Sequence, residues 1–371
     1  MDRRHFLGNT LHAICGTALT TGAAAQGTCL EARFAPAADI LRQSVADGQV
    51  AAASLWVKQQ ETVATYAFGK ATTPDAVFLL ASISKTISVA TIMTLFDERL
   101  FQLTDPVRRY IPEFSGEGRE HITIVQLMTH TAGLPDQLPQ NTALRTAHAP
   151  LSEFVAAAVR TPLLFEAGTQ YSYSSMGILL AAELAMRICG KDFSELVQER
   201  IYDPLQLQRS AMGLGQFTRD DVMQGQLEHA AAESGAGDPS TADWDWNSEY
   251  WRRLGAPWGG AHGSAGDVGI FLDEILHARS IVLRPATARQ MVQNHNPKGL
   301  RPRGLGFDLG SQAGNGQGSP QQFGHTESTG TLCWADPETD TICVVLTTLP
   351  GTAANPHPRD RVSAEVARSC R

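Results

Sequence analysis

A serine and a lysine open a stretch of helix-like sequence at residues 81–96, where a buried face should be apolar. One helical stripe there consists of Ser82, Lys85, Val89, Ile92 and Phe96. Ser82 and Lys85 are then one turn apart, within reach of each other. Burial and the positive end of the helix dipole both lower the pKa of an ammonium group, so Lys85 can accept a proton from Ser82. A serine hydroxyl beside such a base is an activated nucleophile.

The Ser-x-x-Lys spacing is short, and it also fits a helix-capping serine followed by a lysine that extends to solvent. The chain contains only five lysines among its 30 Lys and Arg residues. A lysine on an apolar stripe is therefore harder to explain as ordinary surface charge. The surrounding sequence has to decide between the two interpretations.

Five segments supply that information. They are ASISKTISVATIMTLFDERLFQLTDPVRRYIPEF from residue 81, ITIVQLMTHTAGLP from 122, YSYSSMGILLAAEL from 171, GLGF from 304 and FGHTESTGTLCWADPETDTICVVLTTL from 323. In this order they resemble the serine β-lactamase-like superfamily, which includes class C β-lactamases, D,D-peptidases and esterases of the same fold. The resemblance runs from about residue 36 to residue 365.

The resemblance implies a role for each matching residue. Ser82 matches the acylated nucleophile, Lys85 its proton partner and Tyr173 the tyrosine that relays protons to the leaving group. Ser175 stands where many members have asparagine. His325 stands where the lactamases have the lysine of Lys-Thr-Gly, and histidine is common there in the esterase-like branches.

The resemblance also implies an oxyanion hole made by the backbone N–H groups of Ser82 and Ser328. Two fixed donors aimed at a tetrahedral oxyanion are typically worth ~3 kcal/mol each in barrier height. Gln137 falls near a polar substrate-contacting position of the class C enzymes. Neither a metal nor a cofactor is expected, because no CxxC, CxxH or HExxH spacing occurs.

One position departs from the family pattern. The family strand reads His-x-Gly, whereas this chain has Glu327 two residues after His325. β-Lactams and D-Ala-D-Ala peptides carry a carboxylate that binds in this region, and a second carboxylate destabilises it unless a cation intervenes. Arg303 is a candidate for that cation. We therefore expect weak turnover of such substrates and a preference for neutral esters or amides.

Three interpretations follow for function. The favoured one is a serine hydrolase that forms an acyl-enzyme on Ser82, with esterase- or amidase-like specificity. The first alternative is a β-lactamase or D-alanyl-D-alanine carboxypeptidase. The second is a non-catalytic binding protein of the same fold, which the presence of Ser82, Lys85 and Tyr173 argues against. An α/β-hydrolase is excluded because no G-x-S-x-G motif occurs.

Composition restricts the partners. The chain has 371 residues, of which 43% are hydrophobic and 18% charged, and a net charge of −8 without any Lys/Arg-rich patch. This composition is typical of a globular protein with a large core, and it argues against nucleic acid as a partner. The family resemblance implies a small ester, amide or peptide as the substrate.

The N-terminus predicts export. Arg3 and Arg4 precede Phe6 and Leu7, and a moderately apolar stretch then leads to small residues near Ala25. This order resembles a bacterial twin-arginine signal over residues 1–25, so a periplasmic or secreted protein is expected. No later segment of the mature chain is long enough to span a membrane.

The remaining chain predicts one α+β domain over residues 30–371. Its antiparallel sheet is flanked by N- and C-terminal helices, with an α/β part at about 30–80 and 255–371 and an inserted helical part at about 81–254. The expected elements are a helix at 36–48, a hairpin at 50–69, a helix after Ser264, strands in the last third and a helix from Pro358.

Two features leave alternatives open. The cysteine pairs Cys29–Cys370 and Cys333–Cys343 could form disulfides in an oxidising compartment, although free buried thiols are the default expectation. The tryptophan and tyrosine cluster at 244–258 either lines an apolar pocket or anchors its long loop to the core. Anchoring is the more common role of aromatic residues in such loops.

Overall fold

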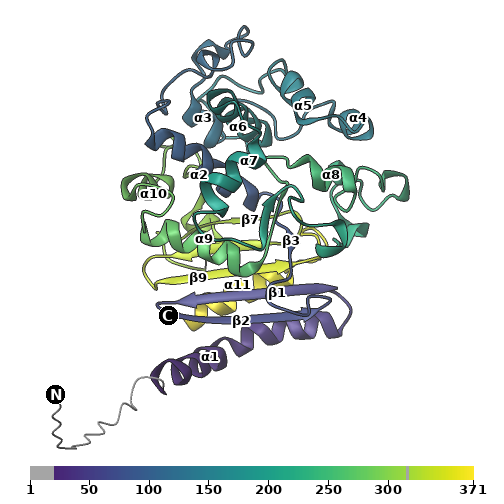
Figure 1. Cartoon of the computed structure of the whole chain (residues 1–371), viewed down its shortest axis with the longest axis vertical. Helices are drawn as coiled ribbons and strands as arrows, with labels where there is room; N and C mark the ends of the chain where they lie inside the picture. Colours follow the sequence, from purple (N-terminus) through teal and green to yellow (C-terminus); the bar gives the residue numbers. More distant parts are fainter. Residues whose placement is uncertain (1–20, 315–316) are drawn as a thin grey trace, which may run out of the picture.

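The computed structural model describes residues 21–314 and 317–371. A six-stranded antiparallel sheet in the order β2-β1-β9-β8-β7-β6 forms the lower half of the molecule (Figure 1). Helices α1 and α11 pack on one face of this sheet, and α9 packs on the other. Most of the remaining helices lie beyond α9, as the sequence predicted for an α+β fold with an inserted helical part.

The strands and helices have the following bounds. The large sheet contains β1 Ala52–Gln59, β2 Thr62–Gly69, β6 Asp308–Leu309, β7 Phe323–Thr326, β8 Leu332–Asp336 and β9 Thr341–Thr347. A three-stranded sheet contains β3 Phe78–Leu79, β4 Ser210–Met212 and β5 Ala261–Gly263. The helices are α1 Thr21–Ala46, α2 Ile83–Asp97, α3 Ile124–Met128, α4 Asn141–Thr146, α5 Leu151–Ala158, α6 Ser175–Cys189, α7 Phe193–Val197, α8 Glu249–Leu254, α9 Ala265–His277, α10 Pro285–Met291 and α11 Pro358–Ser369.

Several expected elements are confirmed. β1 and β2 form the predicted hairpin, and α11 begins at Pro358. Ser264 caps α9, since its side chain accepts a hydrogen bond from the backbone N–H of Asp267. The strand β4 was not predicted, because three residues are too few to show a periodic pattern.

The N-terminal helix is longer than predicted. α1 begins at Thr21 rather than at residue 36, and Pro36 lies inside it. Residues 1–20, which carry the twin-arginine pattern of the predicted signal at 1–25, lie outside the described residues, as does the side chain of Cys29. No helix in the described part of the chain is long and apolar enough to cross a membrane.

The default expectation of free, buried thiols is confirmed for Cys333 and Cys343, and the alternative of a disulfide between them is wrong. Cys333 pairs in register with Val344, and Cys343 pairs with Trp334. Because successive residues of a strand point to opposite faces, this offset of one residue places the two thiols on opposite sides of the sheet. Both are free, and burial raises the pKa of both thiols.

Helix α2 is the central element of the helical part, and it is not amphipathic. Every residue from Ile83 to Leu95 is buried, so the polar side chains at its start must find partners inside the protein. Ser84 Oγ accepts a hydrogen bond of 2.9 Å from the N–H of Ala261, and Ser88 Oγ donates one of 2.6 Å to the carbonyl of Pro257. These contacts attach α2 to the segment that leads into β5.

Candidate active site

Ser82 lies in the tight turn between β3 and α2. The backbone of this turn is fixed from two sides: Leu80 N–H donates to Ala261 O at 2.9 Å, and Thr331 Oγ1 donates to Leu80 O at 3.1 Å. Ala81 has φ of +47°, a left-handed conformation that costs a residue with a Cβ about 1–2 kcal/mol. The neighbouring strands hold this conformation, and Ser82 follows directly as the N-cap of α2.

Lys85 is fully buried and points at Ser82. Its Nζ donates a hydrogen bond of 2.6 Å to Ser82 Oγ and one of 2.8 Å to the carbonyl of Trp258. The same atom lies 4.7 Å from the centre of the Tyr173 ring. Ser82 and Tyr173 line a cavity, and Lys85 lies buried next to both of them.

The protonation of Lys85 is set mainly by its surroundings. Burial lowers its pKa to about 8, although the negative charges of Glu327 and Asp136 act in the opposite direction. Burial raises the pKa of Tyr173 well above its ordinary value, while a hydrogen bond with Ser82 acts against that rise. A neutral lysine is therefore accessible near neutral pH, whereas a tyrosinate is not.

The backbone around Ser82 and Ser328 offers two free donors. Glu327 N–H donates to Thr331 O at 3.0 Å, and Gly351 N–H donates to Ser328 O at 2.7 Å, which fixes the connection after β7. Among the residues described, neither the backbone N–H of Ser82 nor that of Ser328 donates a hydrogen bond to a protein acceptor. Both serines border the same cavity, as an oxyanion hole requires.

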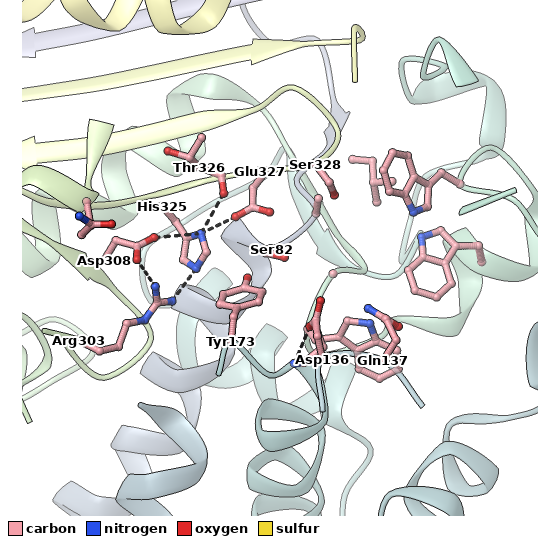
Figure 2. Close-up of a pocket in the computed structure, with 18 of the residues that line it drawn as sticks. Ser82, Asp136, Gln137, Tyr173, Arg303, Asp308, His325, Thr326, Glu327 and Ser328 are labelled. Atoms are coloured by element: carbon pink, nitrogen blue, oxygen red, sulfur yellow. Dashed lines mark hydrogen bonds and ion pairs between the residues drawn. The ribbon is translucent and has the colours of Figure 1, made fainter. Parts of the chain in front are cut away.

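A buried chain of charged groups extends along β7 (Figure 2). Arg303 is fully buried and pairs with Asp308, and its Nη2 donates to His325 Nε2 at 2.7 Å. Nδ1 of His325 pairs with Oε1 of Glu327. Arg303, the predicted cation, is therefore bound to Asp308 and His325, and His325 rather than Arg303 contacts Glu327.

Ser175 faces a residue that sequence analysis did not identify. Its N–H and its hydroxyl both donate to Oδ1 of Asp136, at 2.9 and 2.6 Å. Asp136 lies beside Gln137, on a segment distant in sequence from Ser175 but adjacent in the fold (Figure 2). The sequence offered only the observation that Asp136 and Gln137 are polar and directly follow the Gly-Leu-Pro motif. Nothing in it shows that Asp136 contacts Ser175 at the start of α6.

One cavity of about 330 Å³ brings nearly all of these residues together. Its walls include Ser82, Asp136, Gln137, Tyr173, Ser175, Arg301, His325, Glu327 and Ser328. Trp246, Trp251 and Trp258 also line it while being buried, so the aromatic cluster both anchors its loop and borders the cavity. In the described part of the chain no group of three or more His, Cys, Asp or Glu side chains is arranged to hold a metal ion.

Comparison with known proteins agrees with this geometry. The profile of the Beta-lactamase family matches residues 37–368. The chain belongs to this family. Solved structures that share the fold include the D-amino acid amidase from Ochrobactrum anthropi SV3, which superposes with a TM-score of 0.69 at 21% identity, over 91% of this chain and 98% of that one.

Individual relatives are distant. The D-alanyl-D-alanine-carboxypeptidase/endopeptidase AmpH of Escherichia coli (strain K12) is 30% identical over 143 residues, which cover 35% of each chain. A β-lactamase of Pseudomonas fluorescens is 27% identical over 139 residues, or 37% of each chain. The match therefore spans only about a third of the length of these curated relatives. The solved structure of EstCE1, described as a hydrolase with promiscuous acyltransferase activity, superposes with a TM-score of 0.71 at 18% identity, over 91% of this chain and all of that one.

Proposed function

We propose that the chain is a serine hydrolase that acts on esters or amides through an acyl-enzyme on Ser82. Neutral Lys85 takes the proton of Ser82 as its Oγ attacks the carbonyl carbon. The N–H groups of Ser82 and Ser328 stabilise the oxyanion. Tyr173, which contacts both Ser82 and Lys85, passes the proton to the leaving group. Water then hydrolyses the acyl-serine and restores the enzyme.

One observation carries this proposal. The Nζ of Lys85 lies 2.6 Å from Ser82 Oγ at a fully buried position where its pKa is lowered to about 8. A capping serine with a solvated lysine would show neither the contact nor the burial. A protein that only binds ligands has no need of a buried base beside an accessible serine, so the non-catalytic interpretation lacks support.

The carboxylate of Glu327 determines which substrate charge we expect the cavity to disfavour. Its carboxylate borders the cavity close to the Ser328 N–H that would hold the oxyanion. A substrate carboxylate placed there would meet a like charge, which is destabilising. We therefore propose that β-lactams and D-Ala-D-Ala peptides are poor substrates relative to esters and amides without a carboxylate.

A specific observation favours the alternative of carboxypeptidase or β-lactamase activity. Arg301 borders the cavity and is partly exposed, and it shares Asp308 with Arg303. Two arginines on one carboxylate leave one positive charge in excess at that end of the cavity. A substrate carboxylate could bind there rather than beside Glu327.

The experiment compares p-nitrophenyl acetate and butyrate with nitrocefin on the purified protein. The proposal expects ester turnover with little nitrocefin turnover, and loss of ester turnover in Ser82→Ala. Ser240→Ala, which changes an exposed serine away from the cavity, is the control and should behave as wild type. Comparable turnover of nitrocefin that falls in Arg301→Ala would instead establish the alternative.

We also propose that the chain is exported, on the basis of the Arg-Arg-x-Phe-Leu sequence at its start. Expression of the full chain in a bacterium followed by fractionation tests this. Periplasmic or secreted protein that becomes cytoplasmic when Arg3 and Arg4 are both changed to lysine would support the twin-arginine route. Unchanged distribution of that variant would contradict it.

A further inference from the structure

We propose that the acyl group of the substrate carries a protonated amine, which binds between Asp136 and Glu327. This inference rests on the proposed function and names its substrate class. Both carboxylates border the cavity that contains Ser82, and Figure 2 shows them on either side of that residue. The negative charges of both carboxylates raise the pKa of Lys85 and that of Tyr173.

Asp136 has a free oxygen on the cavity side. Ser175 occupies only Oδ1 of its carboxylate, with both of its hydrogen bonds. Within the described part of the chain, Oδ2 accepts no hydrogen bond and Asp136 forms no ion pair. The carboxylate is therefore held in place at one oxygen and open to a ligand at the other.

Among the residues described, no lysine or arginine side chain contacts the carboxylate of Glu327. It is 95% buried, and His325 is its only ion-pair partner among the residues described. A guanidinium can only donate, so the hydrogen bond from Arg303 requires Nε2 of His325 to be unprotonated. The ring proton then lies on Nδ1, which contacts Oε1 of Glu327 and lies 3.4 Å from the carbonyl oxygen of Thr326. Oε2 has no partner in the described structure.

Gln137 provides a third acceptor. Its Oε1 atom is buried and has no hydrogen-bond partner among the described residues, and Gln137 borders the same cavity. A buried acceptor without a donor is costly, and an N–H group of a ligand in the cavity would supply that donor. Two carboxylate oxygens and one amide oxygen match a group with three N–H donors and a positive charge, which is an alkylammonium ion.

The chemistry of acylation strengthens this assignment. Attack by Ser82 places a negative charge on the substrate oxygen. Three carboxylates line the cavity, and Asp308 is paired with Arg301 and Arg303, whereas Asp136 and Glu327 contact no arginine or lysine among the residues described. These carboxylates oppose the oxyanion, since like charges in a poorly solvated site repel strongly. A substrate ammonium between them offsets the repulsion as the charge develops. The amine should therefore increase kcat as well as binding.

The test compares two p-nitrophenyl esters of equal size. The 3-aminopropanoyl ester ends in an ammonium where the butanoyl ester ends in a methyl group. Each kcat/KM is divided by the rate of buffer hydrolysis to remove intrinsic reactivity. We expect the normalised ratio, ammonium over methyl, to be at least about tenfold in the wild type.

Asp136→Asn retains an Oδ1 acceptor for Ser175 and removes the charge, so the ratio should fall several-fold. Glu327→Gln should also lower the ratio of the two esters. This second variant tests the proposal even if Asp136→Asn does not fold. Asp220→Asn removes an exposed carboxylate elsewhere and should keep the wild-type ratio. Thermal unfolding of each variant shows that it is folded.

The outcomes separate the inference from the proposed function. If the butanoyl ester is hydrolysed through Ser82 and the ammonium ester is no better, the inference is wrong and the proposed function stands. A high ratio that neither variant lowers would overturn the assignment to Asp136 and Glu327. If neither ester is hydrolysed at any pH and no acyl-enzyme forms, the proposed function itself fails.

Discussion

Arg303 donates a hydrogen bond of 2.7 Å from its Nη2 to Nε2 of His325. This contact determines the tautomer of the imidazole, because a guanidinium has no acceptor. The remaining proton lies on Nδ1, which faces Glu327. Neither nitrogen is available to take the proton of Ser82. His325 therefore connects Arg303 to Glu327, which fits a positioning role, and Lys85 remains the proposed base.

Replacement of His325 should alter the rate without removing the basic group. His325→Gln retains hydrogen-bonding capacity but not the imidazole, so kcat/KM for p-nitrophenyl butyrate should fall by roughly tenfold or more as Glu327 loses its support. The rise of kcat/KM with pH should remain, since Lys85 is unchanged. Loss of that rise in the variant would identify His325 as the base and contradict the tautomer assignment.

The pH profile reports on Lys85 directly. The base must be neutral, and the pKa of Lys85 is lowered to about 8, so kcat/KM should increase as pH rises through about 8. Glu327 is the largest of the charges that raise this pKa. Glu327→Gln should therefore move the rise to lower pH. A shift to higher pH would contradict the charge assignment, and Lys70→Met, at an exposed position, should leave the profile unchanged.

Two glycines of α9 should respond oppositely to alanine. A Cβ at Gly269 would lie 2.5 Å from the ring of Trp56 on β1, whereas a Cβ at Gly266 would meet nothing closer than 3.8 Å. Gly269→Ala should cost about 1–3 kcal/mol of the free energy of unfolding through overpacking. Gly266→Ala should gain up to about 1 kcal/mol from helix propensity. Urea unfolding measures both free energies, and equal effects of the two substitutions would contradict the close packing of Gly269 against Trp56.

Stability should decrease in mild acid. Burial lowers the pKa of His262 to about 3 and that of His357 to about 4, so both are neutral in the folded protein. Below about pH 6.5 the unfolded chain binds protons at these histidines and the folded chain does not. The free energy of unfolding should therefore fall between pH 7.5 and pH 5. His357→Asn should reduce this slope; a slope unaffected by the variant would show that His357 does not contribute.

Sequence patterns predicted the elements with long or repeated signals. The β1–β2 hairpin, the Ser264 cap and the C-terminal helix follow from alternation, capping chemistry and a proline start. The start of α1 was misplaced because its alanine-rich first half carries no amphipathic pattern. The register between the strands that carry Cys333 and Cys343 depends on the geometry of the turn that joins them. A shift of one residue moves a side chain to the opposite face of the sheet.

The site was predictable where the chemistry is local in sequence. Ser82 and Lys85 are one helical turn apart, so their contact follows from helix geometry. Asp136 was missed because its contact with Ser175 joins two distant segments. The position of Arg303 beside His325 likewise depends on how β7 packs against the preceding loop. Distances of this kind arise from tertiary packing, which no local pattern encodes.

The central claim, that Ser82 is the nucleophile activated by Lys85, is tested most directly by locating the acyl group. The protein is mixed with p-nitrophenyl butyrate, quenched in acid and analysed by intact mass and peptide mapping. The account predicts a single butanoyl group on Ser82, absent from Ser82→Ala and formed far more slowly by folded Lys85→Met. Turnover with the acyl group on another residue, or unchanged acylation in Lys85→Met, would contradict it.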